Sequence, residues 1–280
     1  MNVRQLSISR RTVAMACAVL ATVSLAIGAH AALSMRALDA AKAVATEQSD
    51  TTGASRLALV IGNGHYPDAN APLAQPINDA RALTSALRRD GFDVDVIEDA
   101  SGDDMVRAVE RLKSKIRKES VVMLFFGGFG VQAGRETYMI PVDATIWREA
   151  DVRREGVSIE SVLSVMKERG ARAKLVVVDA SRRNPYERRF RSFSHGLAPI
   201  NAPDNALILT SATPGKVADD SRGEHSVLVS ELLNNLAAQG GAAEAVFNKT
   251  RVAISRASDG EQVPSVSSSL LEDVRLGTGG

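Results

Sequence analysis

Cysteine is almost absent from this sequence, because the 280 residues contain only one, Cys17. It lies inside an apolar run near the N-terminus that we expect to be removed, so the mature protein would contain no cysteine. Without cysteine a chain can form no disulfide and can offer no thiolate nucleophile. The sequence therefore excludes cysteine-based catalysis from the mature domain.

Strong net charge and clustered metal ligands are also lacking. The formal net charge is +1 at pH 7, and no long basic stretch is interleaved with aromatic residues, so we expect no nucleic acid partner. The four histidines are scattered and none forms the His-Glu-x-x-His pattern, so we expect no metal. After Gly62-Asn63-Gly64, Pro67-Asp68 stands where a dinucleotide fingerprint needs a third glycine and a helix. We therefore expect no cofactor.

The N-terminal segment has the three-part order of a secretory signal. Basic residues precede an apolar run from Val13 to Ile27, and Ala29-His30-Ala31 supplies small residues for cleavage. We expect residues 1–31 to be a signal peptide and the protein to be exported to the periplasm. The alternative is an uncleaved inner-membrane anchor over residues 12–28, which is short for the ~20 apolar residues of a spanning helix. Membrane contact is expected only through such an uncleaved leader.

The remainder divides into a tether at 32–55, one domain at 56–276 and a short tail at 277–280. In the domain, short apolar runs alternate with helical patterns, which indicates an α/β fold with a largely parallel sheet. Val121 to Phe126 is continuously apolar, which is typical of a central strand covered on both faces. The other predicted strands are Leu57–Ile61, Phe92–Ile97, Leu175–Val178 and Leu207–Thr210, with a hairpin arm at Tyr138–Val142; the predicted helices are at about 78–89, 105–116, 159–166, 227–236 and 242–254.

Three loops follow the predicted strands at the edge where open α/β sheets bind ligands. They are Gly62 to His65, Gly127 to Gly130, and Asp179 to Pro185. The glycines of the second loop permit either a close backbone approach to a ligand or a tight strand-to-loop turn.

Together these segments resemble the caspase-like cysteine peptidases of bacteria, the orthocaspase and metacaspase group, over roughly Arg56 to Leu276. The resemblance implies a caspase-like three-layer α/β/α sandwich with a mostly parallel central sheet. The matching segments are Leu57–Tyr66 (LALVIGNGHY), Pro76–Leu87 (PINDARALTSAL), Phe125–Gln132 (FFGGFGVQ), Tyr138–Ala144 (YMIPVDA), Val178–Pro185 (VDASRRNP), Ser211–Asp220 (SATPGKVADD) and Val263–Leu270 (VPSVSSSL).

The departures from the family pattern fall on its catalytic residues. Phe129 stands where the family has its histidine, and Ser181 stands where it has its nucleophilic cysteine. A phenyl ring can neither accept nor donate the proton that this chemistry moves, and a serine hydroxyl needs an adjacent base. We expect the inherited peptidase activity to be absent.

The resemblance also implies an acidic pocket for a basic side chain of a peptide or protein ligand. Asp179 matches the aspartate that lines it, and Asp220 or Asp219 would offset Arg183, which replaces a second acidic residue of the family pattern. The alternative for Asp179 is a carboxylate that only accepts hydrogen bonds from backbone N–H groups at a strand end.

Three functions remain open on this sequence. The first is an exported, catalytically inactive caspase-like domain that binds a peptide or protein. The second is a serine-type hydrolase in which Ser181 acts with a relocated base, for which His65 is placed better than His195 or His225. The third is a structural envelope domain in which Phe129 plugs the former site.

Overall fold

The computed structural model describes residues 55–67, 72–180, 197–218, 223–237 and 241–276. The predictions for the leader, the tail and nearly all of the tether fall outside these ranges. Within them, the helices are too short or too polar to cross a membrane.

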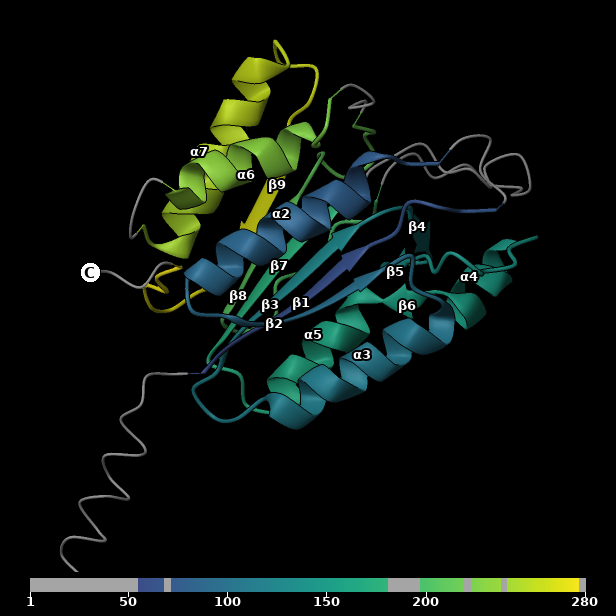
Figure 1. The fold of residues 1–280 in the computed structure, drawn as a ribbon, viewed down its shortest axis with the longest axis horizontal. Coiled ribbons are helices and arrows are strands. Elements are labelled where there is room, and N and C mark those ends of the chain that lie inside the picture. The colour runs from purple at the N-terminus through teal and green to yellow at the C-terminus, as the bar shows by residue number, and fades with distance from the viewer. Residues whose placement is uncertain (1–54, 68–71, 181–196, 219–222, 238–240, 277–280) are drawn as a thin grey trace, which may run out of the picture. The chain divides into compact units, whose positions relative to one another are not determined.

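One six-stranded sheet forms the centre of the domain (Figure 1). The strand order is β2-β1-β3-β7-β8-β9, and the strands from β2 to β8 pair in parallel while β9 pairs antiparallel with β8. The sequence prediction of a mostly parallel sheet is confirmed. The strands are β1 (Arg56–Gly62), β2 (Asp93–Glu98), β3 (Val121–Gly127), β7 (Ala173–Asp179), β8 (Ala206–Thr210) and β9 (Ser265–Ser268).

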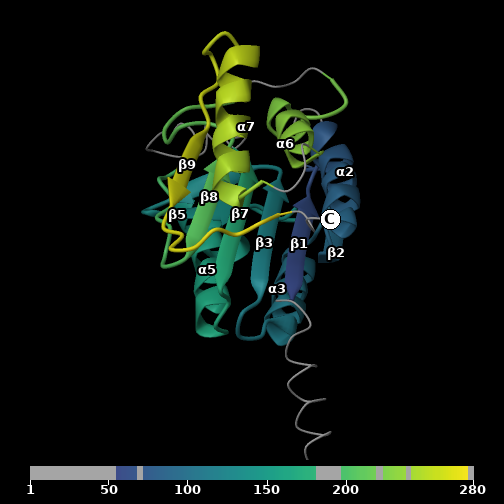
Figure 2. The same cartoon turned by 90° about the vertical axis from the view of Figure 1, so that its left-hand side faces the viewer.

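Helices cover both faces of this sheet and complete three layers, as Figures 1 and 2 show. One face carries α2 (Gln75–Arg89), α6 (Val227–Ala237) and α7 (Ala243–Ala257). The opposite face carries α3 (Gly102–Lys115) and α5 (Ile159–Glu168). The α/β fold class with a three-layer arrangement is therefore as the sequence predicted.

The strand β3 lies in the middle of the sheet and is apolar on both of its faces. Successive side chains of a strand point to opposite faces. Val122, Leu124 and Phe126 pack in the core beneath α3 and α5, whereas Val121, Met123 and Phe125 pack in the core beneath α2, α6 and α7. All seven residues of β3 are buried, so the prediction that this strand is central is confirmed.

Local signals explain where the helices begin. Ser101 and Asp104 form a capping box at the start of α3, because each side chain accepts a hydrogen bond from the other's backbone N–H. Ser158 caps α5 through Ser161 N. Helix α2 begins at Gln75, three residues before the predicted start, because Pro76 occupies its first turn, where a missing N–H costs nothing.

A small antiparallel sheet, β4-β5-β6, follows β3. The predicted hairpin arm at Tyr138–Val142 is present, but its strand begins and ends earlier, as β5 (Glu136–Met139), and pairs with β4 (Gly130–Ala133). Three further short elements were not predicted from periodicity. They are β6 (Val157–Ser158), α4 (Glu149–Glu155) and the edge strand β9.

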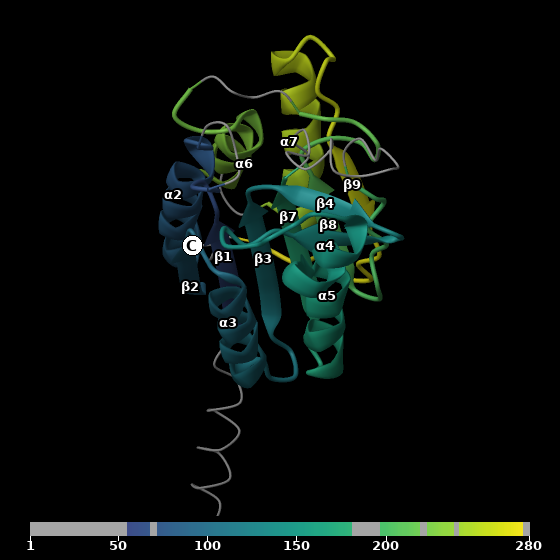
Figure 3. The same cartoon turned by 90° about the vertical axis from the view of Figure 1, so that its right-hand side faces the viewer.

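The register of the parallel strands brings the predicted loops together. Gly62 is the Cα partner of Gly127, and Gly127 is the partner of Asp179. The chain therefore leaves β1, β3 and β7 at one level of the same edge, where Figure 3 shows β4 and α4 as well.

Candidate functional site

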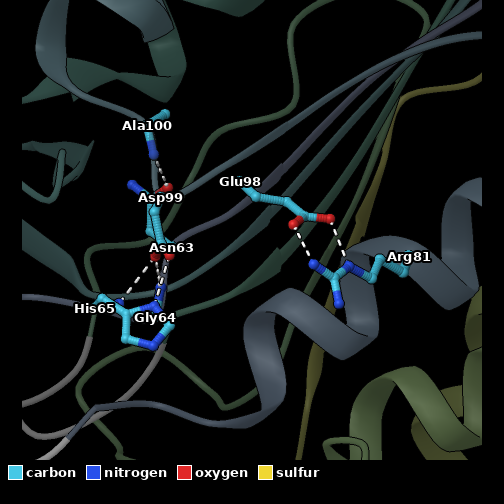
Figure 4. A network of polar contacts seen from close by, with 7 residues as sticks. All are labelled: Asn63, Gly64, His65, Arg81, Glu98, Asp99 and Ala100. Carbon is cyan, nitrogen blue, oxygen red and sulfur yellow. Dashed lines mark hydrogen bonds and ion pairs between the residues drawn. The ribbon is translucent and has the colours of Figure 1, made fainter.

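Asn63 joins the loops at this edge of the sheet (Figure 4). Its side chain is fully buried; the amide Nδ2 donates to Ile140 O at 3.1 Å, and Oδ1 accepts from Ala100 N at 2.9 Å. Its backbone N donates to Gly127 O at 2.8 Å. Asn63, one residue after β1, thus bonds to the segment after β2, to the end of β3 and to the segment after β5. These hydrogen bonds link the loops at this edge of the sheet.

His65 pairs with Asp99 close to Asn63, as Figure 4 shows. Asp99 Oδ1 accepts from the backbone N of Gly64 and of His65 at 2.8 and 2.9 Å, and His65 Nδ1 lies 2.6 Å from Asp99 Oδ2. Partial burial alone would raise the pKa of Asp99, but the two N–H groups and the imidazole hold it below its ordinary value. The His65 side chain is 69% exposed, so the pair lies at the surface.

Phe129, which the sequence analysis matched to the family's histidine, is packed into the protein. The residue is 7% exposed, and its ring lies 4.7 Å from the ring of Tyr66, centroid to centroid, at a tilt of 59°. Its backbone N donates to the hydroxyl of Tyr66, which donates to Ile140 O, both at 3.0 Å. The ring belongs to an apolar cluster formed by Tyr66, Phe129, Val131, Ala133, Tyr138, Ile140, Ala144, Ile146 and Val152.

The two residues beside Phe129 are glycines because other parts of the chain lie very close to them. A Cβ at Gly128 would lie 2.6 Å from the Tyr66 hydroxyl, and one at Gly130 would lie 2.8 Å from Cδ2 of Leu197. Both contacts are too close for an ordinary side chain. The glycine-rich sequence is therefore explained by a tight strand-to-loop connection, and no ligand is needed to account for it.

Asp179 is at the end of β7, where the sequence predicted it, and is 1% exposed. A second buried carboxylate, Asp79 on α2, lies near enough for the negative charge of Asp179 to act on it. The sequence analysis missed Asp79. Its signal was position, because Asp79 falls on the same helical face as Pro76, Leu83 and the other buried residues of α2, where an acidic side chain is unusual.

Asp79 is held by the start of α6. The backbone N of Ser226 donates to both carboxylate oxygens, at 3.2 and 3.3 Å, and His225 Nδ1 lies 2.9 Å from Oδ1. Burial, followed by the charge of Asp179, raises the pKa of Asp79 from 3.8 to about 7, against the opposing effect of these two partners. The sequence analysis could not place His225, and the structure puts it on this carboxylate.

The remaining predicted site residues, Ser181 and Asp220, lie outside the described residues, as do Arg183, Asp219 and His195. Among the residues that are described, no group of three or more His, Cys, Asp or Glu side chains is arranged to hold a metal ion. The described site therefore consists of two parts. One is a buried acidic pair, Asp79 and Asp179, and the other is the buried ring of Phe129 in contact with Tyr66.

Comparison with known proteins gives a family for this arrangement. A family model described as a caspase domain matches residues 55–275. Two similar proteins are mucosa-associated lymphoid tissue lymphoma translocation protein 1 of Homo sapiens and its homologue in Mus musculus. Each is 28% identical over 134 residues, which are 47% of this chain and 16% of the relative. The chain thus matches a small part of these longer proteins.

Proposed function

Because the chain belongs to the caspase domain family of peptidases, we propose that it is an exported member without catalytic activity that binds a peptide or protein through a basic side chain. Export rests on the signal-like order of residues 1–31.

The observation that carries the loss of catalysis is the packing of Phe129. A general base must reach the proton that it removes, and must be able to accept it. The phenyl ring has no such group, and it is held by the ring of Tyr66 and by hydrogen bonds on both sides of its peptide unit. The position is therefore part of an apolar cluster and supplies no base.

The acidic pair supports ligand binding at the same edge. Asp79 and Asp179 are each 1% exposed, and burying two charged carboxylates together costs free energy. The pKa of Asp79 is raised because burial and the charge of Asp179 disfavour its charged form. A guanidinium or ammonium group between Asp79 and Asp179 would remove this repulsion and supply charge-assisted hydrogen bonds. A basic side chain is thus the ligand chemistry that this pair favours.

Cleavage is tested with a mixed fluorogenic peptide library and the purified mature protein, with Ser181→Ala in parallel. We expect no turnover by either protein when both are folded by circular dichroism. Turnover that disappears in Ser181→Ala would refute an inactive domain.

Binding is tested with an acetylated, amidated peptide that contains one arginine and with the same peptide containing citrulline, which has the shape of arginine without its charge. We expect the arginine peptide to bind more tightly by about tenfold or more at about pH 8. Asp179→Asn should remove the preference. Asp93→Asn is the matched control. Asp93 is the first residue of β2, at the edge of the sheet away from the acidic pair, and it pairs with Lys115 at the surface. Equal binding of both peptides would contradict the proposal.

A second candidate, a serine-type hydrolase, is favoured by one observation, the pairing of His65 Nδ1 with Asp99. A carboxylate on Nδ1 orients an imidazole so that Nε2 can act as a base. Labelling of Ser181 by a fluorophosphonate probe that is lost in His65→Gln would establish this candidate. No labelling of folded protein would exclude it, and absence of both labelling and binding would leave the structural envelope domain.

A further inference from the structure

Asp79 already has a nitrogen base of this chain beside it. His225, in the segment before α6, lies with Nδ1 2.9 Å from Asp79 Oδ1, and its side chain is 27% exposed whereas Asp79 is 1% exposed. The next residue also contacts the carboxylate, through Ser226 N. The imidazole is therefore more accessible to solvent than the carboxylate that it contacts.

The segment that carries His225 is attached to α2 at a second point. Asn78 Nδ2 donates to Glu224 O at 3.2 Å. Ser226 in turn begins α6, because its hydroxyl accepts from Val229 N at 3.1 Å. The backbone position of His225 is thus set by residues on either side of it in the chain, and those bonds do not involve its ring.

Two charged groups in the described part of the chain act on Asp79: the carboxylate of Asp179 at the end of β7, and His225 itself. Glu224 precedes His225 and is exposed. From α6, Asp79 receives a neutral donor, the N–H of Ser226. Protonation of Asp79 therefore changes the net charge of the acidic pair directly.

We propose that His225 is the internal occupant of the acidic pair and determines its specificity: a ligand binds when its guanidinium or ammonium group displaces the imidazole from Asp79. This inference rests on the proposed function and adds a selection rule to it. A neutral side chain offers the two carboxylates no charge-assisted hydrogen bond, whereas arginine and lysine do because they stay charged at neutral pH.

The competition makes binding depend on pH in a defined direction. At low pH, Asp79 is protonated, because burial and the charge of Asp179 raise its pKa to about 7, and the pair then has less negative charge to offer a ligand. As pH rises through neutrality, Asp79 loses its proton and the affinity for a cation increases. If binding releases one proton, affinity changes by about tenfold per pH unit below the transition.

The test uses the arginine peptide and the mature protein, with titration calorimetry from about pH 5.5 to about pH 8.5. His225→Lys places a permanent cation beside Asp79 and should weaken binding at about pH 8 by about tenfold or more. His225→Gln, which is uncharged, should bind at that pH within about threefold of the wild type. Asn234→Lys, which adds the same charge at an exposed position of α6, is the matched control and should leave binding unchanged.

A second readout follows His225 itself. Ring 15N signals of the histidines should show that the His225 signals, assigned with His225→Gln, shift on addition of the arginine peptide and do not shift on addition of the citrulline peptide. Binding that is insensitive to His225→Lys, with unmoved His225 signals, would overturn the inference and leave the proposed function intact. Failure of the arginine peptide to bind either the wild type or His225→Gln would overturn the proposed function as well.

Discussion

The ring of Phe129 contributes to the packing of the domain. It contacts Tyr66 and fills the apolar cluster that surrounds β4 and β5. Phe129→Ala should therefore lower the free energy of unfolding by about 3–5 kcal/mol, measured by urea denaturation. Tyr66→Phe keeps the ring contact and loses the hydroxyl that links Phe129 N to Ile140 O, so it should cost about 1–3 kcal/mol. A loss below about 1 kcal/mol for Phe129→Ala would contradict the packed position.

Asp79 predicts a pH dependence of stability. Its folded pKa, about 7, exceeds its ordinary value of 3.8, so folding favours the protonated carboxyl. This stabilisation is complete below about pH 4 and is lost as pH rises to about 7. Asp79→Asn is neutral at every pH, so its melting temperature relative to the wild type should be higher at about pH 8 than at about pH 4.5. A constant difference between the two proteins would show that Asp79 titrates normally.

At the scale of single residues, the sequence indicated one half of the acidic pair. Asp179 was recognisable because it ends an apolar strand and because its motif resembles that of the family. Asp79 and His225 were not, since 146 residues separate them and nothing local to either residue predicts their contact. Periodicity describes which face of an element is buried, and it contains no information on which buried polar groups meet.

Among the elements, α3 offers a direct test of a sequence signal. Ser101→Ala removes the side chain that accepts from Asp104 N and should destabilise the protein by about 1 kcal/mol. Ser114→Ala, near the other end of the same helix and exposed, should change stability by less than about 0.5 kcal/mol. Chemical denaturation of both variants measures the difference, and equal effects would argue against the capping box.

The length of an element decided how well it could be predicted. Long elements such as α2 and β3 repeat their apolar pattern often enough to be recognised, and their observed bounds lie within a few residues of the predicted ones. A seven-residue helix such as α4 and a two-residue strand such as β6 are too short to show a period. The strand β6 forms by pairing with β5, and at the start of α4 the side chain of Asp151 accepts a hydrogen bond from the backbone N of Arg148.

For the whole molecule, the order of residues 1–31 predicts export with removal of the leader. The mature protein should then begin at Ala32 and appear in the periplasmic fraction of a bacterial host. Intact mass and N-terminal sequencing of that fraction measure this. A membrane-bound product that retains residues 1–31 would show the alternative, an uncleaved anchor.

The fold could be predicted more completely than the site because parallel pairing follows from the alternation of strands and helices along the chain. The same alternation predicted that the loops after β1, β3 and β7 would meet, and their register shows that they do. What occupies that meeting point depends on individual side chains, as the burial of Phe129 and the pairing of His225 illustrate.

The two ends of the domain meet across the sheet, since Arg56 at the start of β1 donates to Leu276 O at 2.7 Å, and the last strand, β9, pairs with β8. A ribosome must therefore finish residues 265–276 before the edge of β8 is covered and the first strand gains its last partner. Until then the nascent domain has an open strand edge, to which another chain can add.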